Sequence, residues 1–71
     1  DRDGYTSLMY AAESGHPEVV RYLVETCRAD IHVVVHSGDW KGLTAVMIAH
    51  RRNKHDVVSY LVSQGAIDPR T

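Results

Sequence analysis

The sequence has little cysteine, no phenylalanine and no long apolar run. Its 71 residues include one cysteine, Cys27, so no disulfide can form within the chain. A single cysteine in so small a domain favours a reducing, intracellular location, cytoplasmic or nuclear. No stretch approaches the ~20 apolar residues of a membrane helix, and no signal peptide is visible. We expect no membrane partner and, because the chain does not begin with methionine, a piece of a longer protein.

An excess of either charge is also lacking. The net charge is −1, which does not attract the chain as a whole to nucleic acid or to an anionic membrane. The two halves differ, however. Residues 1–38 hold three basic and six acidic side chains, whereas residues 39–71 hold five basic and three acidic ones. This asymmetry can orient a partner, but it does not identify one.

No group of catalytic residues is recognisable. The sequence has no glycine-rich phosphate loop, no Ser–His–Asp arrangement and no close pair of carboxylates. Cys27 could act as a nucleophile only beside a base and an oxyanion site, and the favoured interpretation is a small core residue at the end of a helix. We therefore predict that the chain is not an enzyme and uses no cofactor.

Two polar clusters allow more than one interpretation. His32 and His36 would share one face of an extended segment near Asp39, as metal ligands do, but exposed hairpin histidines are the favoured interpretation, and no cysteine pair supports zinc. The basic residues of segment 51–54 could contact nucleic acid. A helix end that favours cations through its dipole is the preferred alternative, and the same cluster can serve a protein contact.

A pattern of two helices stands out near the start of the chain. Thr6 is a natural N-cap, because its hydroxyl can accept a free N–H of the first turn, and Gly15 is suited to the left-handed conformation that ends a helix. Pro17 then suits the first position of a second helix. The apolar stripe of that second helix has helical period and consists of Val19, Val20, Leu23, Val24 and Cys27.

The same pattern returns 38 residues later. Thr44 follows Thr6 at this offset, and Asn53 takes the place of Gly15, as the next-best residue for a left-handed helix end. Tyr22 and Tyr60 occupy equivalent positions, and we expect both to be packing residues. Between the copies, residues 31–38 are rich in β-branched residues without helical period, which predicts a β-hairpin.

These motifs resemble the ankyrin repeat. Asp-x-x-Gly-x-Thr, x-Leu-x-x-Ala-Ala, Gly-His-x-Glu-Val-Val and x-Leu-Val occur in order, and the resemblance covers nearly the whole chain. It implies an all-α repeat of helix–turn–helix units with a β-hairpin between repeats, over a family period of ~33 residues. We assign repeat one to residues 1–30, the extended hairpin to 31–38 and repeat two to 39–68. His50 departs from the pattern, since the family has alanine there.

The resemblance also implies a function, protein–protein interaction through hairpin tips and the exposed ends of the first helices of each repeat. The corresponding residues here are Arg2, Asp3, Tyr5, Glu13, Ser14, Trp40, Lys41, Leu43, Arg51 and Arg52. Trp, Tyr and Arg dominate binding hot spots. Trp40 either contacts a partner or covers the base of the hairpin.

Three alternatives to a stand-alone recognition module remain open. The chain could be an accessory targeting module of a larger enzyme, such as a kinase or a ubiquitin-ligase component. It could contact nucleic acid through its basic second half. It could also associate with a second copy of itself through the hairpin edge.

Overall fold

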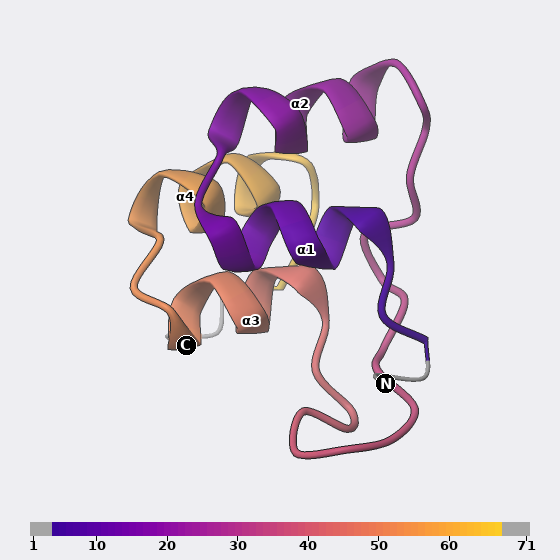
Figure 1. Ribbon diagram of the computed structural model, residues 1–71. Coiled ribbons are helices and arrows are strands. Elements are labelled where there is room, and N and C mark those ends of the chain that lie inside the picture. The colour runs from indigo at the N-terminus through magenta and orange to yellow at the C-terminus, as the bar shows by residue number, and fades with distance from the viewer. Residues whose placement is uncertain (1–3, 68–71) are drawn as a thin grey trace.

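The computed structural model describes residues 4–67, which form four α-helices and no β-strand. The helices are α1 (Ser7–Ser14), α2 (Pro17–Glu25), α3 (Ala45–Arg51) and α4 (His55–Ser63). Helices α1 and α2 make one helix–turn–helix pair, and α3 and α4 make a second. Figure 1 shows the two pairs stacked, with α1 beside α3 and α2 beside α4. The predicted all-α repeat is confirmed.

The signals that begin and end α1 act as the sequence predicts. The Met9 N–H donates to Thr6 Oγ1 at 3.2 Å, and the Thr6 N–H donates to Met9 Sδ at 3.3 Å, so that each residue caps the other. Gly15 then adopts φ +75°, and its N–H bonds to carbonyls of the last turn. Pro17 occupies the first position of α2, as expected. Local chemistry thus sets a helix of only two turns.

The second pair starts with the same spacing but with weaker caps. Helices α3 and α4 each begin 38 residues after α1 and α2. Asn53 adopts φ +60° between them, which confirms its predicted left-handed role. Thr44 holds the N-cap backbone geometry of α3, yet its Oγ1 is buried and has no hydrogen-bond partner among residues 4–67. An unsatisfied buried hydroxyl costs stability, so α3 depends on packing more than α1 does.

One hydrophobic core joins both pairs. Small alanines on α1 and α3 let these two helices approach closely, and branched residues of α2 and α4 close the core from the other side. The buried residues are Leu8, Met9, Ala11, Ala12, Val20, Val35, Ala45, Val46, Ile48, Ala49, Val57, Val58, Leu61 and Ala66. Because the core is shared, neither pair buries its apolar face alone.

The segment between the pairs is a loop, and the expected β-hairpin over residues 31–38 is wrong. Among contacts within residues 4–67, those of Val35 resemble a ladder: its N–H donates to the Leu43 carbonyl at 3.0 Å, and its own carbonyl accepts from Gly42 N–H at 2.7 Å. Before it, Asp30 Oδ1 accepts from the His32 N–H at 2.8 Å, which turns the chain away from a strand. A strand needs several consecutive residues paired with a neighbouring strand, and within residues 4–67 this segment has one such residue, Val35.

Two burial predictions also need correction. Cys27 is exposed and does not belong to the core, because α2 ends at Glu25 and the chain turns away through Arg28, at φ +57°. Tyr22 is 58% exposed and is not a packing residue, whereas Tyr60 is half-buried against the core. The same residue type at the same repeat position therefore has two different environments.

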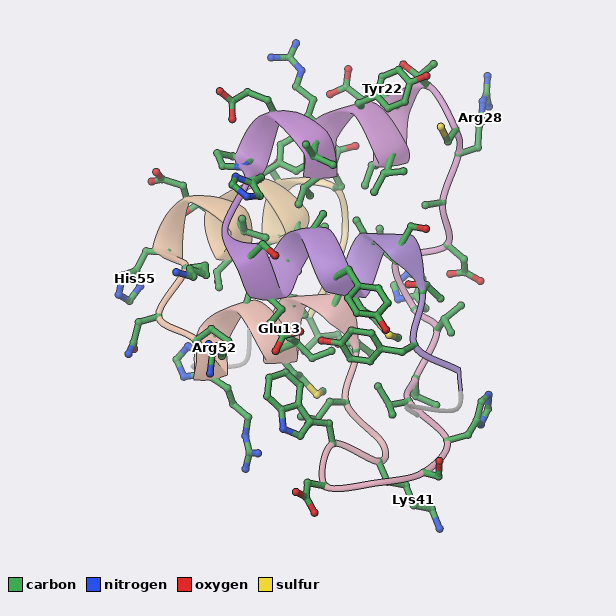
Figure 2. All side chains as sticks on the ribbon, viewed as in Figure 1. Glu13, Tyr22, Arg28, Lys41, Arg52 and His55 are labelled. Carbon is green, nitrogen blue, oxygen red and sulfur yellow. The ribbon has the colours of Figure 1, made fainter. Side chains whose placement is uncertain are left out.

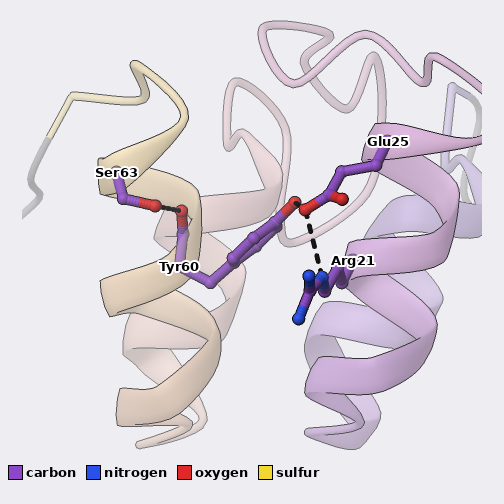
Figure 3. A network of polar contacts seen from close by, with 4 residues as sticks. All are labelled: Arg21, Glu25, Tyr60 and Ser63. Atoms are coloured by element: carbon purple, nitrogen blue, oxygen red, sulfur yellow. Dashed lines mark hydrogen bonds and ion pairs between the residues drawn. The ribbon is translucent and has the colours of Figure 1, made fainter.

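A polar network ties the two outer helices together. The Tyr60 hydroxyl of α4 donates to Glu25 Oε2 of α2 at 2.7 Å, and Arg21 Nε lies 3.2 Å from the same oxygen (Figure 3). The Ser63 hydroxyl donates to the Tyr60 carbonyl at 2.6 Å. The Tyr60–Glu25 hydrogen bond thus joins α4 to the last turn of α2.

Candidate partner-binding surface

The expected site residues lie on two sides of the inner helices. Arg2 and Asp3 fall outside the described residues, so their place in a surface stays a prediction. Tyr5 precedes α1, and Glu13 and Ser14 end it. Trp40, Lys41 and Leu43 lie in the loop before α3, and Arg51 and Arg52 end that helix.

The structure brings Tyr5, Glu13 and Trp40 together. The Tyr5 hydroxyl donates to Glu13 Oε1 at 2.7 Å. The Tyr5 ring meets the Trp40 ring edge-on, with centroids 6.4 Å apart, and meets the Tyr10 ring edge-on at 4.5 Å. Edge-to-face geometry of this kind stabilises aromatic pairs by about 0.5–1.5 kcal/mol. The contact between Tyr5 and Trp40 joins residues that are 35 positions apart in the chain, one from each repeat.

Trp40 covers the core at the base of the loop, which is one of the two roles that the sequence left open, and its contact with a partner stays a prediction. Its side chain is half-buried and packs against the core, so it covers the base of the loop. Trp40 is therefore less exposed than a residue whose side chain serves a partner alone. Lys41, the next residue in the loop, is exposed (Figure 2).

The loop itself is held in place at both ends. Leu43 is half-buried against the core, and Val35 opposite is fully buried. Gly38 and Gly42 both have positive φ, +85° and +86°, where other residues would be strained. These contacts and turn conformations restrict the backbone around Trp40, and such restriction lowers the entropy cost of binding.

The far end of α3 carries positive charge. Arg51 and Arg52 are exposed, and neither forms an ion pair with another residue of the range 4–67. Figure 2 shows Arg52 at one end of α3 and Lys41 beyond the other. Beside this end, a shallow cavity of about 280 Å³ is lined by Gly15, Asn53, Lys54, His55, Asp56 and Val57. Ser14 is exposed at the adjacent end of α1.

Two groups in the network between α2 and α4 have shifted pKa values. The hydrogen bond from Tyr60 holds the pKa of the Glu25 carboxyl below its ordinary value of 4.5, and Arg21 adds to the effect. Burial raises the pKa of Tyr60 above 10.0, and the adjacent Glu25 carboxylate raises it further. Both shifts favour the pair as it stands in the folded chain, a neutral phenol beside a carboxylate.

The geometry gives no support to a metal site at His32 and His36. His32 and His36 are both exposed, and His36 lies against Gly4 rather than beside a third ligand. Within residues 4–67, no three His, Cys, Asp or Glu side chains are grouped where they could hold an ion. None of the helices in the same range has the length and apolar character that crossing a bilayer requires.

Comparison with known proteins places the chain in a family. Two ankyrin repeat family models match, one at residues 3–33 and the other at residues 41–71. The chain therefore belongs to the ankyrin repeat family, as its motifs indicated, and domains of this family are generally non-catalytic protein-interaction modules.

One similar protein is far longer than this chain. The chain is similar to alpha-latroinsectotoxin-Lt1a of Latrodectus tredecimguttatus, with 41% identity over 64 residues. The match covers 90% of this chain but 4% of the relative. No solved structure matches.

Sequence reasoning missed Tyr10, which completes the aromatic group around Tyr5. Tyr10 lies off the stripe of Leu8, Ala11 and Ala12 that faces the core, and it is 56% exposed. A large aromatic residue off the apolar stripe of a short helix was the available signal.

Proposed function

We propose that the chain binds another protein through one continuous surface, formed by the loop around Trp40 and the exposed ends of α1 and α3. This surface offers Trp40 and Tyr5 as aromatic anchors, with Lys41 on one side and Arg51 and Arg52 on the other. The observation that carries the proposal is the Tyr5–Trp40 contact, which links the anchors of both repeats into one site.

The composition of this surface supports the proposal. Binding energy concentrates in Trp, Tyr and Arg side chains that lie near the centre of an interface. Here a half-buried Trp packs against the core, which restricts the movement of its ring before binding. The exposed arginines have no carboxylate partner in residues 4–67, so a partner's carboxylates would not have to displace one.

The test compares variants against a partner captured on the wild-type chain from the cells that produce it. Trp40→Ala should weaken binding by at least about 2 kcal/mol, roughly 30-fold in Kd. Trp40→Leu keeps apolar cover over the core and guards against simple unfolding. Arg52→Glu should weaken binding too, whereas Arg28→Glu, a matched charge reversal on the far side of the molecule, should not (Figure 2).

Two results would refute the proposal. Binding that is unchanged in Trp40→Leu and Arg52→Glu, with both variants folded, would place the recognition surface elsewhere. A steep fall of nucleic-acid affinity with salt concentration, together with no protein partner, would favour the basic second half as a nucleic-acid contact.

The same surface would serve as a targeting module within a larger enzyme, which is the remaining alternative. The small share of its relative that the chain covers is compatible with that setting. Self-association through a strand edge has lost its basis, because residues 4–67 contain no strand.

A further inference from the structure

The two ends of α3 differ in charge. At the loop end, half-buried Trp40 lies in the sequence between exposed Asp39 and exposed Lys41, so the charges beside it offset each other. At the other end, Arg51 and Arg52 are both exposed and follow one another in the chain. The proposed binding surface therefore has an apolar, nearly neutral end and a basic end, with one helix between them.

The fold satisfies the last turn of α3 without the two arginine side chains. Its carbonyls at Ile48, Ala49 and His50 already accept backbone N–H groups of residues 52–54, at 2.8–3.1 Å. Cationic side chains near the end of a helix can bond to such carbonyls, but here the backbone fills that role. Neither guanidinium forms an ion pair within residues 4–67, so both can meet the carboxylates of a partner.

Lys54 adds a third cation, and packing restricts its side chain. Its methylene groups cover Gly15, since a Cβ built there would lie 2.6 Å from Lys54 Cδ and 2.8 Å from Lys54 Cε. Lys54 is half-buried and lines the shallow cavity beside the turn between α3 and α4, together with His55. Asp56 is the one carboxylate among the residues that line this cavity. Residues 51–56 thus hold three cations and one anion, and this end of the surface is positive.

The length of α3 sets the distance between the two ends. Its seven residues, at a rise of 1.5 Å each, span about 10 Å. The turn from Trp40 to Leu43, closed by a 3.0 Å hydrogen bond from the Leu43 N–H to the Trp40 carbonyl, adds at most about 7 Å. An extended peptide rises about 3.3 Å per residue, so it covers this distance in roughly three to five residues.

We infer that the surface recognises an extended acidic segment of its partner. An apolar side chain of that segment contacts Trp40, and a pair of carboxylates about four residues away contacts Arg51 and Arg52. The inference rests on the proposed function, because it specifies the partner of the same surface. Carboxylates match the fork of an arginine, whereas a basic segment would be repelled. Asp39 disfavours further carboxylates at the loop end, so the charges also orient the segment along α3.

Short synthetic peptides with blocked ends test this inference directly. One has the sequence Gly-Leu-Ser-Gly-Ser-Glu-Glu-Gly, with leucine four positions before the first glutamate, and a second has the reverse order, so that both directions along α3 are covered. Trp40 is the only tryptophan, so its indole N–H signal in NMR spectra reports on the loop end, and arginine Nε–H signals report on the basic end. With one of the two peptides, we expect both sets of signals to shift with a single Kd.

Three changes make the result specific to the charges and to their spacing. Glutamine in place of both glutamates should weaken binding about fivefold, a factor within the range of two exposed ion pairs. Placing the glutamates next to leucine keeps the composition and should abolish the simultaneous shift at both ends. Arg52→Glu should weaken binding of the acidic peptide and strengthen binding of its counterpart with two lysines. Arg28→Glu, the matched control on the far side of the molecule, should do neither (Figure 2).

Three results would overturn the inference. Equal affinity for the glutamate and glutamine peptides would rule out an acidic segment; the proposed function would still stand if Trp40→Leu and Arg52→Glu weaken binding of the captured partner. Equal affinity for the spaced and the adjacent arrangements would rule out the spacing set by α3. A ten-nucleotide single-stranded DNA that binds more tightly than any of the peptides, with a steep dependence on salt, would make nucleic acid the partner of this surface.

Discussion

Leu61→Ala, compared with Leu23→Ala, tests how the core is built. The two leucines are 38 residues apart and equivalent in the repeat, but Leu61 is fully buried and Leu23 only half-buried. Deleting about three buried carbons at Leu61 costs about 2.4 kcal/mol in transfer free energy, at ~0.8 kcal/mol for each. A residual cavity of about 50 Å³ would add roughly 1.2 kcal/mol. We therefore expect a loss of about 3–4 kcal/mol at Leu61 and about half of that at Leu23.

That loss is large for a chain of this size. At roughly 0.05–0.15 kcal/mol per residue, the free energy of unfolding is about 3.5–11 kcal/mol. Urea unfolding followed by circular dichroism at 222 nm should show a much lower midpoint for Leu61→Ala, or no folded baseline, and a smaller shift for Leu23→Ala. Equal losses at both positions, or a loss below about 1 kcal/mol at Leu61, would refute the shared core described here.

Two further predictions concern the turns and the polar network. Gly15→Ala should destabilise the chain more than Gly42→Ala. Both glycines have positive φ, which costs an alanine about 1–2 kcal/mol, but of these two positions only Gly15 would bring the added Cβ against another side chain. Equal melting temperatures of the two variants would contradict this prediction. Tyr60→Phe should lower the Tm most between about pH 4.5 and pH 10, and should therefore flatten the dependence of the Tm on pH. The lowered pKa of Glu25 adds stability above about pH 4.5 that is lost as pH falls, and the raised pKa of Tyr60 adds stability below about pH 10 that is lost as pH rises. The Tm difference between wild type and Tyr60→Phe, followed from acid to alkali, should shrink at both ends; a constant difference would show that the hydrogen bond is not coupled to ionisation.

Features set by local chemistry could be predicted from the sequence. Thr6, Gly15, Pro17 and Asn53 act on the backbone within a turn of their own position, so the limits of α1, the start of α2 and the turn after α3 followed from the residue types alone. The ankyrin motifs then supplied the stacking, which no short window of sequence contains.

Features set by distant neighbours could not be predicted. Tyr22 and Tyr60 are the same residue at the same repeat position, and only the presence of a helix beside one of them separates their environments. The stretch before Val35 has strand-like residues, but a strand needs a partner, and the sequence could not show that, within residues 4–67, Val35 alone pairs with the loop before α3. Cys27 satisfied the helical period, although α2 ends before reaching it.

The candidate site also has features that the sequence could predict and features that it could not. The motif indicated Trp40 and Tyr5 separately, and nothing in the sequence placed their rings in contact. The role of the ten expected residues in binding stays a prediction, as does the intracellular location expected from the single cysteine.

The most direct measurement of the central claim is a hydrogen–deuterium exchange footprint of the chain in complex with its captured partner. The account predicts protection of the loop at residues 36–44 and of the α3–α4 turn at residues 50–54, with exchange along α2 unchanged. Protection confined to α2 and α4, with the loop around Trp40 exchanging as in the free chain, would contradict it.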